Sequence, residues 1–342
     1  MKAAVWTDYN KIEVKEIPTP EIGKEEALIK VRAAGVCVTD YHVISGKLKI
    51  GTPPNVQGHE ICGEVFKINT ERKDIKIGDS CVIATSLGCG HCAACREGKQ
   101  YLCTESSEIG YTPHNGGYAE YVKVPVSAIV PIPNEVSDAA GAILESAVCP
   151  TESLMNVGVE LNSTAFVLGA GPAALAFISL LKVMGAGKII ALVRREETKE
   201  RVLKAGATHV INSKETPNVE EKLLEITNGN KADIVIESTG APSVISEALN
   251  YVAKGGKYIL YGIPGDDEVV NFNIKKIITE EIRIYGAVGN TKAWYPLVEL
   301  IANKKFNIES FVTHKFKLDD IDKAFDLYRN HDGSLIKAII EF

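Results

Sequence analysis

The chain has 342 residues, of which 45% are hydrophobic and 24% are charged, and its formal net charge is −6 at pH 7. This composition predicts a globular protein of about two domains, and the negative charge argues against nucleic acid as a partner, because nucleic acid attracts a basic surface. No signal peptide and no membrane-spanning helix are predicted from the apolar segments. We therefore expect a cytoplasmic protein without a membrane anchor, whose eight cysteines are thiols or metal ligands instead of disulfides.

The predicted elements of the N-terminal part are mainly strands. Apolar and β-branched runs, separated by turn residues, predict strands at residues 2–6, 12–17, 26–34 and 61–68. A glycine turn at Gly116 precedes a further strand, and small residues after Ser137 predict the start of a helix. We therefore expect the chain to begin with a β domain.

Two polar groups interrupt these strands. In the first group, four side chains that can bind metal or carry protons lie within six residues, namely Cys37, Thr39, Asp40 and His42. In the second group, His59 and Glu60 follow Gly58 just before the predicted strand 61–68. Considered alone, the first group is explained as well by a chance polar cluster as by a function, and a lone His-Glu pair is usually structural.

Residues 89–103 contain four cysteines with the spacing C-x2-C-x2-C-x7-C, at Cys89, Cys92, Cys95 and Cys103. Four thiolates in one short loop suit a tetrahedral zinc ion without an open coordination position, so the predicted site is structural and not catalytic. An iron–sulfur cluster also takes four thiolates, but the spacing to the fourth cysteine differs from the bacterial ferredoxin pattern and no proline follows Cys103. We therefore expect zinc to hold this loop together.

From Thr164 onward, predicted strands and helices alternate. The predicted strands are 164–168, 188–193, 232–236, 257–262 and 281–286, and the predicted helices are 172–185, 196–205, 218–228 and 242–253. This alternation is typical of a doubly wound parallel sheet in an α/β domain. The last part of the chain differs, with a helix at 293–304, a strand at 311–317, a helix at 319–330 and a strand at 336–342.

The first strand of this alternating region ends in a glycine-rich turn. Gly169 lets the chain reverse, Gly171 leaves room for a pyrophosphate, and the small side chain of Ala174 allows the next helix to pack against the strand. The free N–H groups and the positive dipole of that helix attract the pyrophosphate. The turn predicts a dinucleotide site formed by Gly169, Gly171, Pro172, Ala173 and Ala174, although a purely structural turn has the same pattern.

The order of these motifs along the whole chain resembles the zinc-containing medium-chain alcohol dehydrogenase/reductase family, and within it the sorbitol (polyol) and threonine dehydrogenase branch. The resemblance implies a GroES-like β catalytic domain at residues 1–152, completed by residues 290–342, and a Rossmann dinucleotide-binding domain at residues 153–289. It also implies a zinc- and NAD(P)-dependent alcohol dehydrogenase with two zinc ions per chain, assembled as a homodimer or homotetramer.

The resemblance assigns a catalytic zinc ion to the first domain. Cys37 and His59 match two of its ligands, and Glu145 stands where the polyol enzymes have a glutamate ligand. The polyol enzymes usually continue this glutamate as Glu-Pro-Leu-Ser, whereas this chain has Glu145-Ser-Ala-Val. Cys149 or Glu152 is therefore an alternative to Glu145 as the ligand that completes the zinc shell.

The same resemblance implies catalytic roles for four further side chains. Glu60 matches a glutamate that can replace a water or ligand on the metal. Asp40 matches a carboxylate that holds the imidazole of the zinc-binding histidine. Thr39 and His42 match a relay that carries a proton to solvent, for which the ordinary pKa of histidine is suitable.

The choice of cofactor is predicted from the end of the second strand of the dinucleotide domain. In NAD-dependent relatives, an acidic residue about 20 residues beyond the glycine turn binds the ribose hydroxyl groups. Here Val193 occupies that place, and Arg194 and Arg195 follow. A guanidinium can bind the 2′-phosphate of NADP bidentately, whereas a carboxylate would repel it. The sequence thus predicts NADP(H) over NAD(H), with Arg194 as the nearer contact; the alternative is a solvated arginine pair.

The predicted reaction is hydride transfer between NADP(H) and a secondary alcohol/ketone pair, such as a polyol, diol or sugar alcohol. A dehydrogenase of simple alcohols or aldehydes would share the metal chemistry and is the alternative. A zinc-free quinone reductase would lack Cys37, His59 and the cysteine loop together. A zinc- and nucleotide-binding scaffold or redox sensor without catalytic activity would leave the first polar group and His59 without a purpose.

Overall fold

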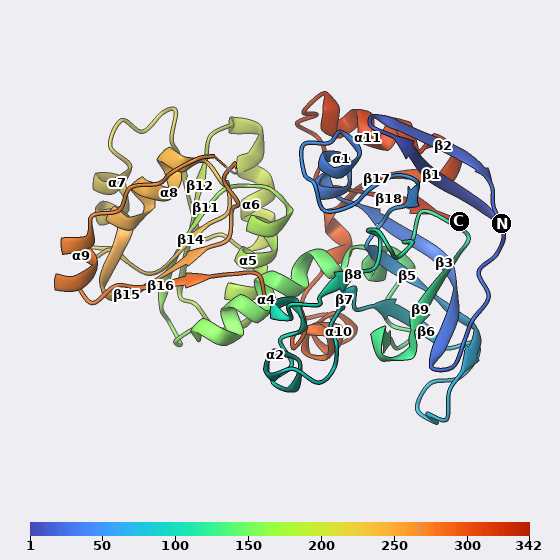
Figure 1. Ribbon diagram of the computed structural model, residues 1–342. Helices are drawn as coiled ribbons and strands as arrows, with labels where there is room; N and C mark the ends of the chain where they lie inside the picture. The colour runs from blue at the N-terminus through green and yellow to red at the C-terminus, as the bar shows by residue number, and fades with distance from the viewer. Residues whose placement is uncertain (266) are drawn as a thin grey trace. The chain divides into compact units, whose positions relative to one another are not determined.

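The computed structural model describes residues 1–265 and 267–342, which form two compact units. The first unit comprises Met1–Val148 and Asn290–Phe342, and the second comprises Cys149–Gly289. Figure 1 shows mainly strands in the first unit and alternating strands and helices in the second. The predicted fold class, a β domain combined with a doubly wound parallel sheet, is confirmed. Among the described residues, no helix is both long and apolar enough to cross a membrane.

A seven-stranded sheet is the basis of the first unit, with the order β10-β6-β5-β3-β18-β17 and with β9 also paired to β3. Its strands are β3 (Glu26–Val36), β5 (Glu60–Asn69), β6 (Ser80–Ile83), β9 (Tyr121–Pro125), β10 (Ile129–Pro131), β17 (Val312–Lys317) and β18 (Lys337–Glu341). Strand β18 comes from the end of the chain and lies antiparallel beside β3 (Figure 1). The C-terminal segment therefore completes the sheet of the N-terminal domain.

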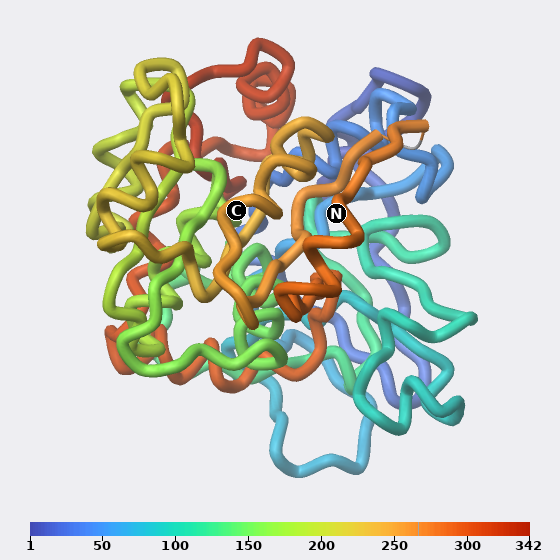
Figure 2. Tube along the Cα trace, turned by 90° about the vertical axis from the view of Figure 1, so that its left-hand side faces the viewer, coloured from blue at the N-terminus to red at the C-terminus, as the bar shows by residue number. Residues whose placement is uncertain are grey.

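Two smaller sheets and five helices complete this unit, and a sixth helix begins in it and continues into the second unit. The strands are β1 (Lys2–Asp8), β2 (Lys11–Glu16) and β4 (Asn55–Val56) in one sheet, and β7 (Ser86–Leu87) and β8 (Ser107–Glu108) in the other. The helices are α1 (Val38–Ile44), α2 (Ala93–Arg96), α3 (Asp138–Ile143), α4 (Glu145–Val157), α10 (Trp294–Ala302) and α11 (Ile321–Arg329). Helix α4 runs across the boundary between the units, so the division at 148/149 precedes the predicted boundary at 152/153. The loop between β5 and β6 projects from the sheet in both views (Figures 1 and 2).

The second unit contains a parallel six-stranded sheet with the order β13-β12-β11-β14-β15-β16, which is the strand order of a Rossmann domain. Its strands are β11 (Thr164–Leu168), β12 (Lys188–Val193), β13 (His209–Asn212), β14 (Ala232–Glu237), β15 (Val252–Leu260) and β16 (Arg283–Gly286). Its helices are α5 (Pro172–Val183), α6 (Lys199–Ala205), α7 (Val219–Ile226), α8 (Pro242–Ala248) and α9 (Ile274–Thr279). Helices α5 and α6 lie on one side of the sheet, and α7 and α8 on the other (Figure 1).

The largest differences from the sequence prediction in the second unit concern four elements. Strand β13 was not predicted, because it has only four residues and begins with the exposed His209. Helix α9 was not predicted either. The predicted helix 242–253 ends at Ala248, and β15 begins at Val252, earlier than predicted, because its first part contains an irregular register around Gly255, whose φ is +71°.

Candidate metal and dinucleotide sites

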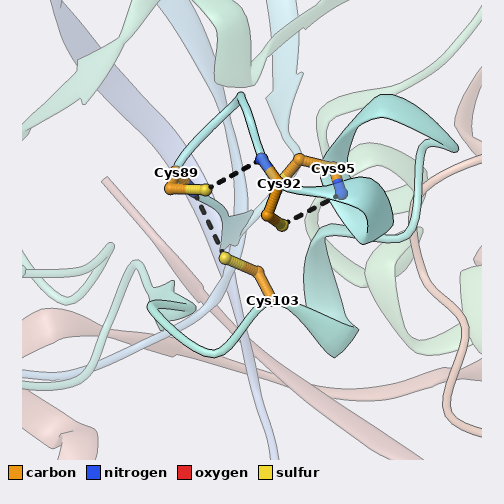
Figure 3. A group of neighbouring side chains, drawn as sticks. All are labelled: Cys89, Cys92, Cys95 and Cys103. Atoms are coloured by element: carbon orange, nitrogen blue, oxygen red, sulfur yellow. Dashed lines mark hydrogen bonds between the residues drawn. The ribbon is translucent and has the colours of Figure 1, made fainter.

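The four cysteines of residues 89–103 converge in the loop between β7 and β8 (Figure 3). The sulfur atoms of Cys89, Cys92, Cys95 and Cys103 all lie within 4.8 Å of one another. Backbone N–H groups point at these sulfurs: Cys92 donates to Cys89 Sγ at 3.4 Å, and Cys95 donates to Cys92 Sγ at 3.4 Å. This arrangement of four sulfurs fits a closed tetrahedral zinc site, as predicted from their spacing.

The protonation of these thiols shows why a cation belongs among them. Hydrogen bonds from the N–H groups of Cys89 and Glu105 lower the pKa of Cys103 to about 7. A backbone hydrogen bond from Gly90 acts to lower the pKa of Cys95, but burial and the neighbouring thiols raise it to about 12. Hydrogen bonds from backbone N–H groups also lower the pKa of Cys89, so two of the thiols ionise more readily than usual, while Cys95 resists further negative charge. A divalent cation would neutralise this charge.

A second group of metal-binding atoms consists of Cys37, His59 and Glu60, whose ligand atoms also lie within 4.8 Å of one another. Cys37 follows β3 and precedes α1, whereas His59 and Glu60 lie at the start of β5. Strands β3 and β5 are paired so that Gly35 faces Glu60. A Cβ atom at residue 35 would lie 2.0 Å from Glu60 Oε2, so glycine is required there to admit the carboxylate.

The imidazole of His59 is held from its Nδ1 side. His59 Nδ1 lies 3.0 Å from Asp40 Oδ1, and Asp40 is fully buried. Burial acts to raise the pKa of Asp40, but His59 and hydrogen bonds from Tyr118 and the Cys37 N–H outweigh it and lower this pKa. Burial acts to lower the pKa of His59, but Asp40 and Cys37 raise it. The Asp40 carboxylate therefore accepts the Nδ1–H, and a metal ion at Nε2 would take the place of a proton.

Glu145 lies on the Nε2 side of the same imidazole. It is the first residue of α4, and its Oε2 atom is 4.0 Å from His59 Nε2. Burial raises the pKa of Glu145 to about 7. In the described residues, none of Glu145, Cys149 and Glu152 belongs to a group of metal-binding atoms within 4.8 Å of one another, so Glu145 is favoured by its distance to His59 Nε2.

Glu60 has one paired and one unpaired carboxylate oxygen. Lys337 Nζ of β18 donates to Glu60 Oε1 at 2.5 Å, and both side chains are buried. Glu60 Oε2 is buried and has no hydrogen-bond partner in the described part of the chain. Burial acts to lower the pKa of Lys337, but the negative charges of Glu60 and Cys37 raise it, so the ammonium keeps its proton. The unpaired oxygen is thus available as a further metal ligand.

The two predicted relay residues lie on helix α1. Thr39 and His42 are three residues apart and therefore share one face of the helix. The Cys37 Sγ and Thr39 Oγ1 atoms are 3.4 Å apart, so the hydroxyl lies beside the candidate metal site. Burial and the nearby Lys47 ammonium lower the pKa of His42, which favours its neutral form.

Three residues around the candidate metal site were not identified from the sequence. Tyr111 and Tyr118 reach His59 and Asp40 from the loop after β8, and Lys337 reaches Glu60 from the last strand. All three are far in the chain from Cys37 and His59, so spacing gives no signal for them. Only the glycine–tyrosine pairs at 110–111 and 117–118 mark the loop as a place of close backbone contact.

The glycine-rich turn has the predicted strand-turn-helix conformation between β11 and α5. Gly169 has a φ of +130°, and Pro172 begins α5. A Cβ atom at Gly171 would meet no atom within 4 Å, so the space above the turn is open to a ligand. Ala174 is buried, and the twelve-residue helix directs its N-terminal N–H groups toward that space.

The end of β12 presents two exposed arginines. Val193 is buried as the last residue of the strand, and Arg194 and Arg195 follow it in exposed positions. Arg195 Nε lies 3.6 Å from Glu197 Oε1, and both of these side chains are largely exposed. Such a pair is weak in water, so the guanidinium can exchange this partner for a phosphate.

Comparison with known proteins identifies the family of the chain. Residues 23–134 match the family described as alcohol dehydrogenase GroES-like domain, and residues 172–303 match the zinc-binding dehydrogenase family. The chain is 29% identical to sorbitol dehydrogenase from Bacillus subtilis, with 99% of this chain and 97% of that protein covered. It is 32% identical to L-threonine 3-dehydrogenase from Pyrococcus horikoshii, with 93% and 92% covered.

Solved structures of similar proteins contain either cofactor. A zinc-binding dehydrogenase from Sinorhizobium meliloti 1021, bound to NADP, has a TM-score of 0.93 and 27% identity, with 100% of this chain and 99% of that chain covered. An alcohol dehydrogenase (rspB) from Escherichia coli CFT073, complexed with NADH, has a TM-score of 0.92 and 26% identity, with 100% and 99% covered. The fold is therefore shared by proteins that bind NADP and by proteins that bind NADH.

Two single substitutions should separate the roles of the two metal-binding groups. We expect Cys37→Ser to abolish turnover, to keep the fold and to lower the thermal unfolding temperature less than Cys95→Ser does. We expect Cys95→Ser to lower the unfolding temperature, because metal bound by the four-cysteine loop contributes folding free energy. Elemental analysis should give two zinc ions in the wild type and about one in each variant. If the two variants lose activity and stability in the same way, this division of roles is wrong.

Proposed function

Because the chain belongs to the zinc-containing medium-chain alcohol dehydrogenase family, we propose that it transfers hydride between NADP(H) and a secondary alcohol/ketone pair, such as a polyol or diol. The family models and the similar proteins show that the chain is an alcohol dehydrogenase-type oxidoreductase. The observation that carries the proposal is the convergence of Cys37, His59 and Glu60, whose ligand atoms lie within 4.8 Å of one another, with Glu145 Oε2 4.0 Å from His59 Nε2.

Cys37, His59 and Glu145 are the proposed ligands of a catalytic zinc ion, and Glu60 Oε2 is the proposed alternative ligand. A thiolate, a neutral imidazole and a carboxylate are donors that zinc accepts, and three protein ligands leave a position for substrate. Bound zinc supplies Lewis acidity, which makes an alcohol oxygen more acidic and a carbonyl carbon more electrophilic. The cysteines of residues 89–103 are the proposed ligands of a second, structural zinc ion.

The protein's own side chains supply orientation and proton transfer. Asp40 holds the Nδ1–H of His59, which fixes the direction of Nε2. Thr39 is proposed to accept the proton of the alcohol and pass it to His42, whose lowered pKa keeps the ring neutral and able to accept it. The hydride is carried by the nicotinamide of the cofactor bound at Gly169–Ala174.

A substrate panel tests the proposed reaction most directly. We expect kcat/KM to be higher for sugar alcohols and vicinal diols than for short primary alcohols, because Glu145 matches the polyol branch, to which the sorbitol dehydrogenase relative belongs. The panel should include threonine, since another relative is a threonine dehydrogenase. A clear preference for primary alcohols would contradict the proposed substrate class and favour the simple-alcohol alternative.

The cofactor preference should depend on the two arginines after β12. A charge pair near 4 Å at an effective dielectric constant of 20 contributes about 4 kcal/mol before desolvation, so even a third of it gives about tenfold selectivity. We expect wild-type kcat/KM to be at least about tenfold higher with NADP(H) than with NAD(H). We expect the double variant Arg194→Ala/Arg195→Ala to lose most of that ratio.

Lys188→Ala, at the other end of the same strand, is the matched control, and it should keep the wild-type ratio. Equal kcat/KM values for the two cofactors in the wild type would refute the proposed preference. An unchanged ratio in the double variant would show that another part of the chain recognises the phosphate.

The pH dependence of alcohol oxidation should report His42. Because only the neutral ring accepts a proton, the rate should rise with pH through the pKa of His42, which lies below its ordinary value. Lys47→Met removes a neighbouring positive charge, so it should raise this pKa and move the acidic limb of the kcat profile to higher pH. Lys49→Met is the control and should leave the limb in place. An identical profile for wild type and Lys47→Met would argue against His42 as the proton acceptor.

A further inference from the structure

Tyr111 contacts His59, a candidate zinc ligand, and no sequence motif predicts this contact. Its hydroxyl oxygen lies 2.9 Å from His59 Nδ1 and 3.4 Å from Asp40 Oδ1. The phenol ring lies against the imidazole, with ring centroids 5.5 Å apart and an interplanar angle of 32°. Tyr111 is itself buried, so no water competes freely for its hydroxyl.

The backbone is shaped to bring Tyr111 to this place. Gly110 has a φ of +101°, and a Cβ atom there would lie 3.1 Å from the carbonyl of Gly58 and 3.2 Å from His59 N. A Cβ atom at Gly116 would lie 2.2 Å from Gly58 O. The loop therefore passes directly over the backbone of Gly58 and His59, and only glycine permits this approach.

The side chains of Asp40, His59 and Tyr111 are joined in a triangle of hydrogen bonds, in which each contacts the other two. The ionised Asp40 carboxylate has no proton to give, so His59 Nδ1–H donates toward Asp40 Oδ1 and the Tyr111 oxygen. The Tyr111 hydroxyl in turn donates to Asp40 Oδ1. Each hydrogen atom then has an acceptor, and the arrangement requires the proton of the neutral imidazole to be on Nδ1.

Tyr118 has a related but different role in this cluster. Its hydroxyl donates to the other oxygen, Asp40 Oδ2, at 2.6 Å, and the Cys37 N–H donates to the same oxygen at 3.3 Å. Within the described part of the chain, the Tyr118 hydroxyl forms its hydrogen bonds with Asp40 and Gly35 and not with His59, and its ring packs edge-on against Phe325. Tyr111 is thus the side chain that contacts the imidazole and its carboxylate partner at the same time.

We infer that Tyr111 is a positioning residue that fixes the ring orientation and tautomer of His59, and thereby slows the loss of metal from Cys37, His59 and Glu145. This inference rests on the proposed ligation by His59 Nε2. Partners behind a metal-binding histidine typically change metal affinity by about 10- to 100-fold when they are removed. The phenol hydroxyl supplies such a contact in addition to the Asp40 carboxylate.

The experiment is zinc release from the holoenzyme to a chromogenic chelator, followed over time. Two zinc sites should give two kinetic phases of release. The phase that is missing in Cys37→Ser belongs to the candidate catalytic site, and the other phase belongs to the four-cysteine loop. We expect Tyr111→Phe, which keeps the ring but removes the hydroxyl, to accelerate the first phase about tenfold and to leave the second unchanged.

Tyr258→Phe is the matched control, because Tyr258 is also buried and its hydroxyl donates to a single backbone carbonyl, Ile245 O, at 2.7 Å. It should lose comparable stability and release zinc at the wild-type rate. Equal release rates for wild type and Tyr111→Phe would overturn the inference. So would faster release from both sites in Tyr111→Phe, which would indicate general loosening of the fold.

A measurement on the wild type covers the case in which Tyr111→Phe does not fold. In the zinc-loaded protein with 15N-labelled histidine, the Nδ1 proton of His59 should be observable and should show a nuclear Overhauser effect to the ring protons of Tyr111. An observable Nδ1 proton without this effect, or a ring protonated on Nε2, would overturn the inference. Only one zinc ion per wild-type chain would instead contradict the proposed function.

Discussion

The balance of charge around His59 is the constraint on which the rest of the first unit depends. Asp40, Glu60 and Glu145 lie with the Cys37 thiol in one largely buried region, where Lys337 supplies a permanent positive charge. Unpaired buried charges cost several kcal/mol each even after relaxation. Burial already raises the pKa of Glu145 to about 7, so this carboxyl group is poised to take a proton or a cation. A divalent ion at His59 Nε2 would neutralise the negatively charged side chains that Lys337 does not contact.

This charge balance explains why the domain is discontinuous in sequence. The cation that pairs with Glu60 is on β18, the last strand of the chain, and β18 reaches Glu60 because it pairs with β3, which in turn pairs with β5. Close approach of these strands depends on Gly35, which has no side chain where the carboxylate lies. Without the C-terminal segment, Glu60 would be a buried carboxylate with neither of its oxygens paired. The site and the sheet therefore depend on the same long-range contact.

The sequence predicted those features that are encoded locally. Strands 164–168 and 188–193 were predicted with their observed bounds, because each is a continuous apolar run ended by a turn, and the cysteine loop was predicted from spacing alone. Lys337 and Tyr111 were not predicted, since each reaches the site through a fold contact between distant segments. Short strands such as β13 were missed for a related reason: their pairing depends on neighbouring strands more than on their own residues.

The four-cysteine loop also acts beyond its own residues. Asn290 Nδ2 donates to Ser86 Oγ at 2.7 Å, and the Thr291 hydroxyl donates to Gly98 O, so the loop holds the segment at which the chain re-enters the first unit. Trp294 Nε1 donates to Asn290 O at 2.8 Å and ties this segment to the start of α10. A metal ion in the loop would therefore order two segments that are far apart in the chain. Its contribution to stability would extend to the C-terminal part, whose last strand brings Lys337 to Glu60.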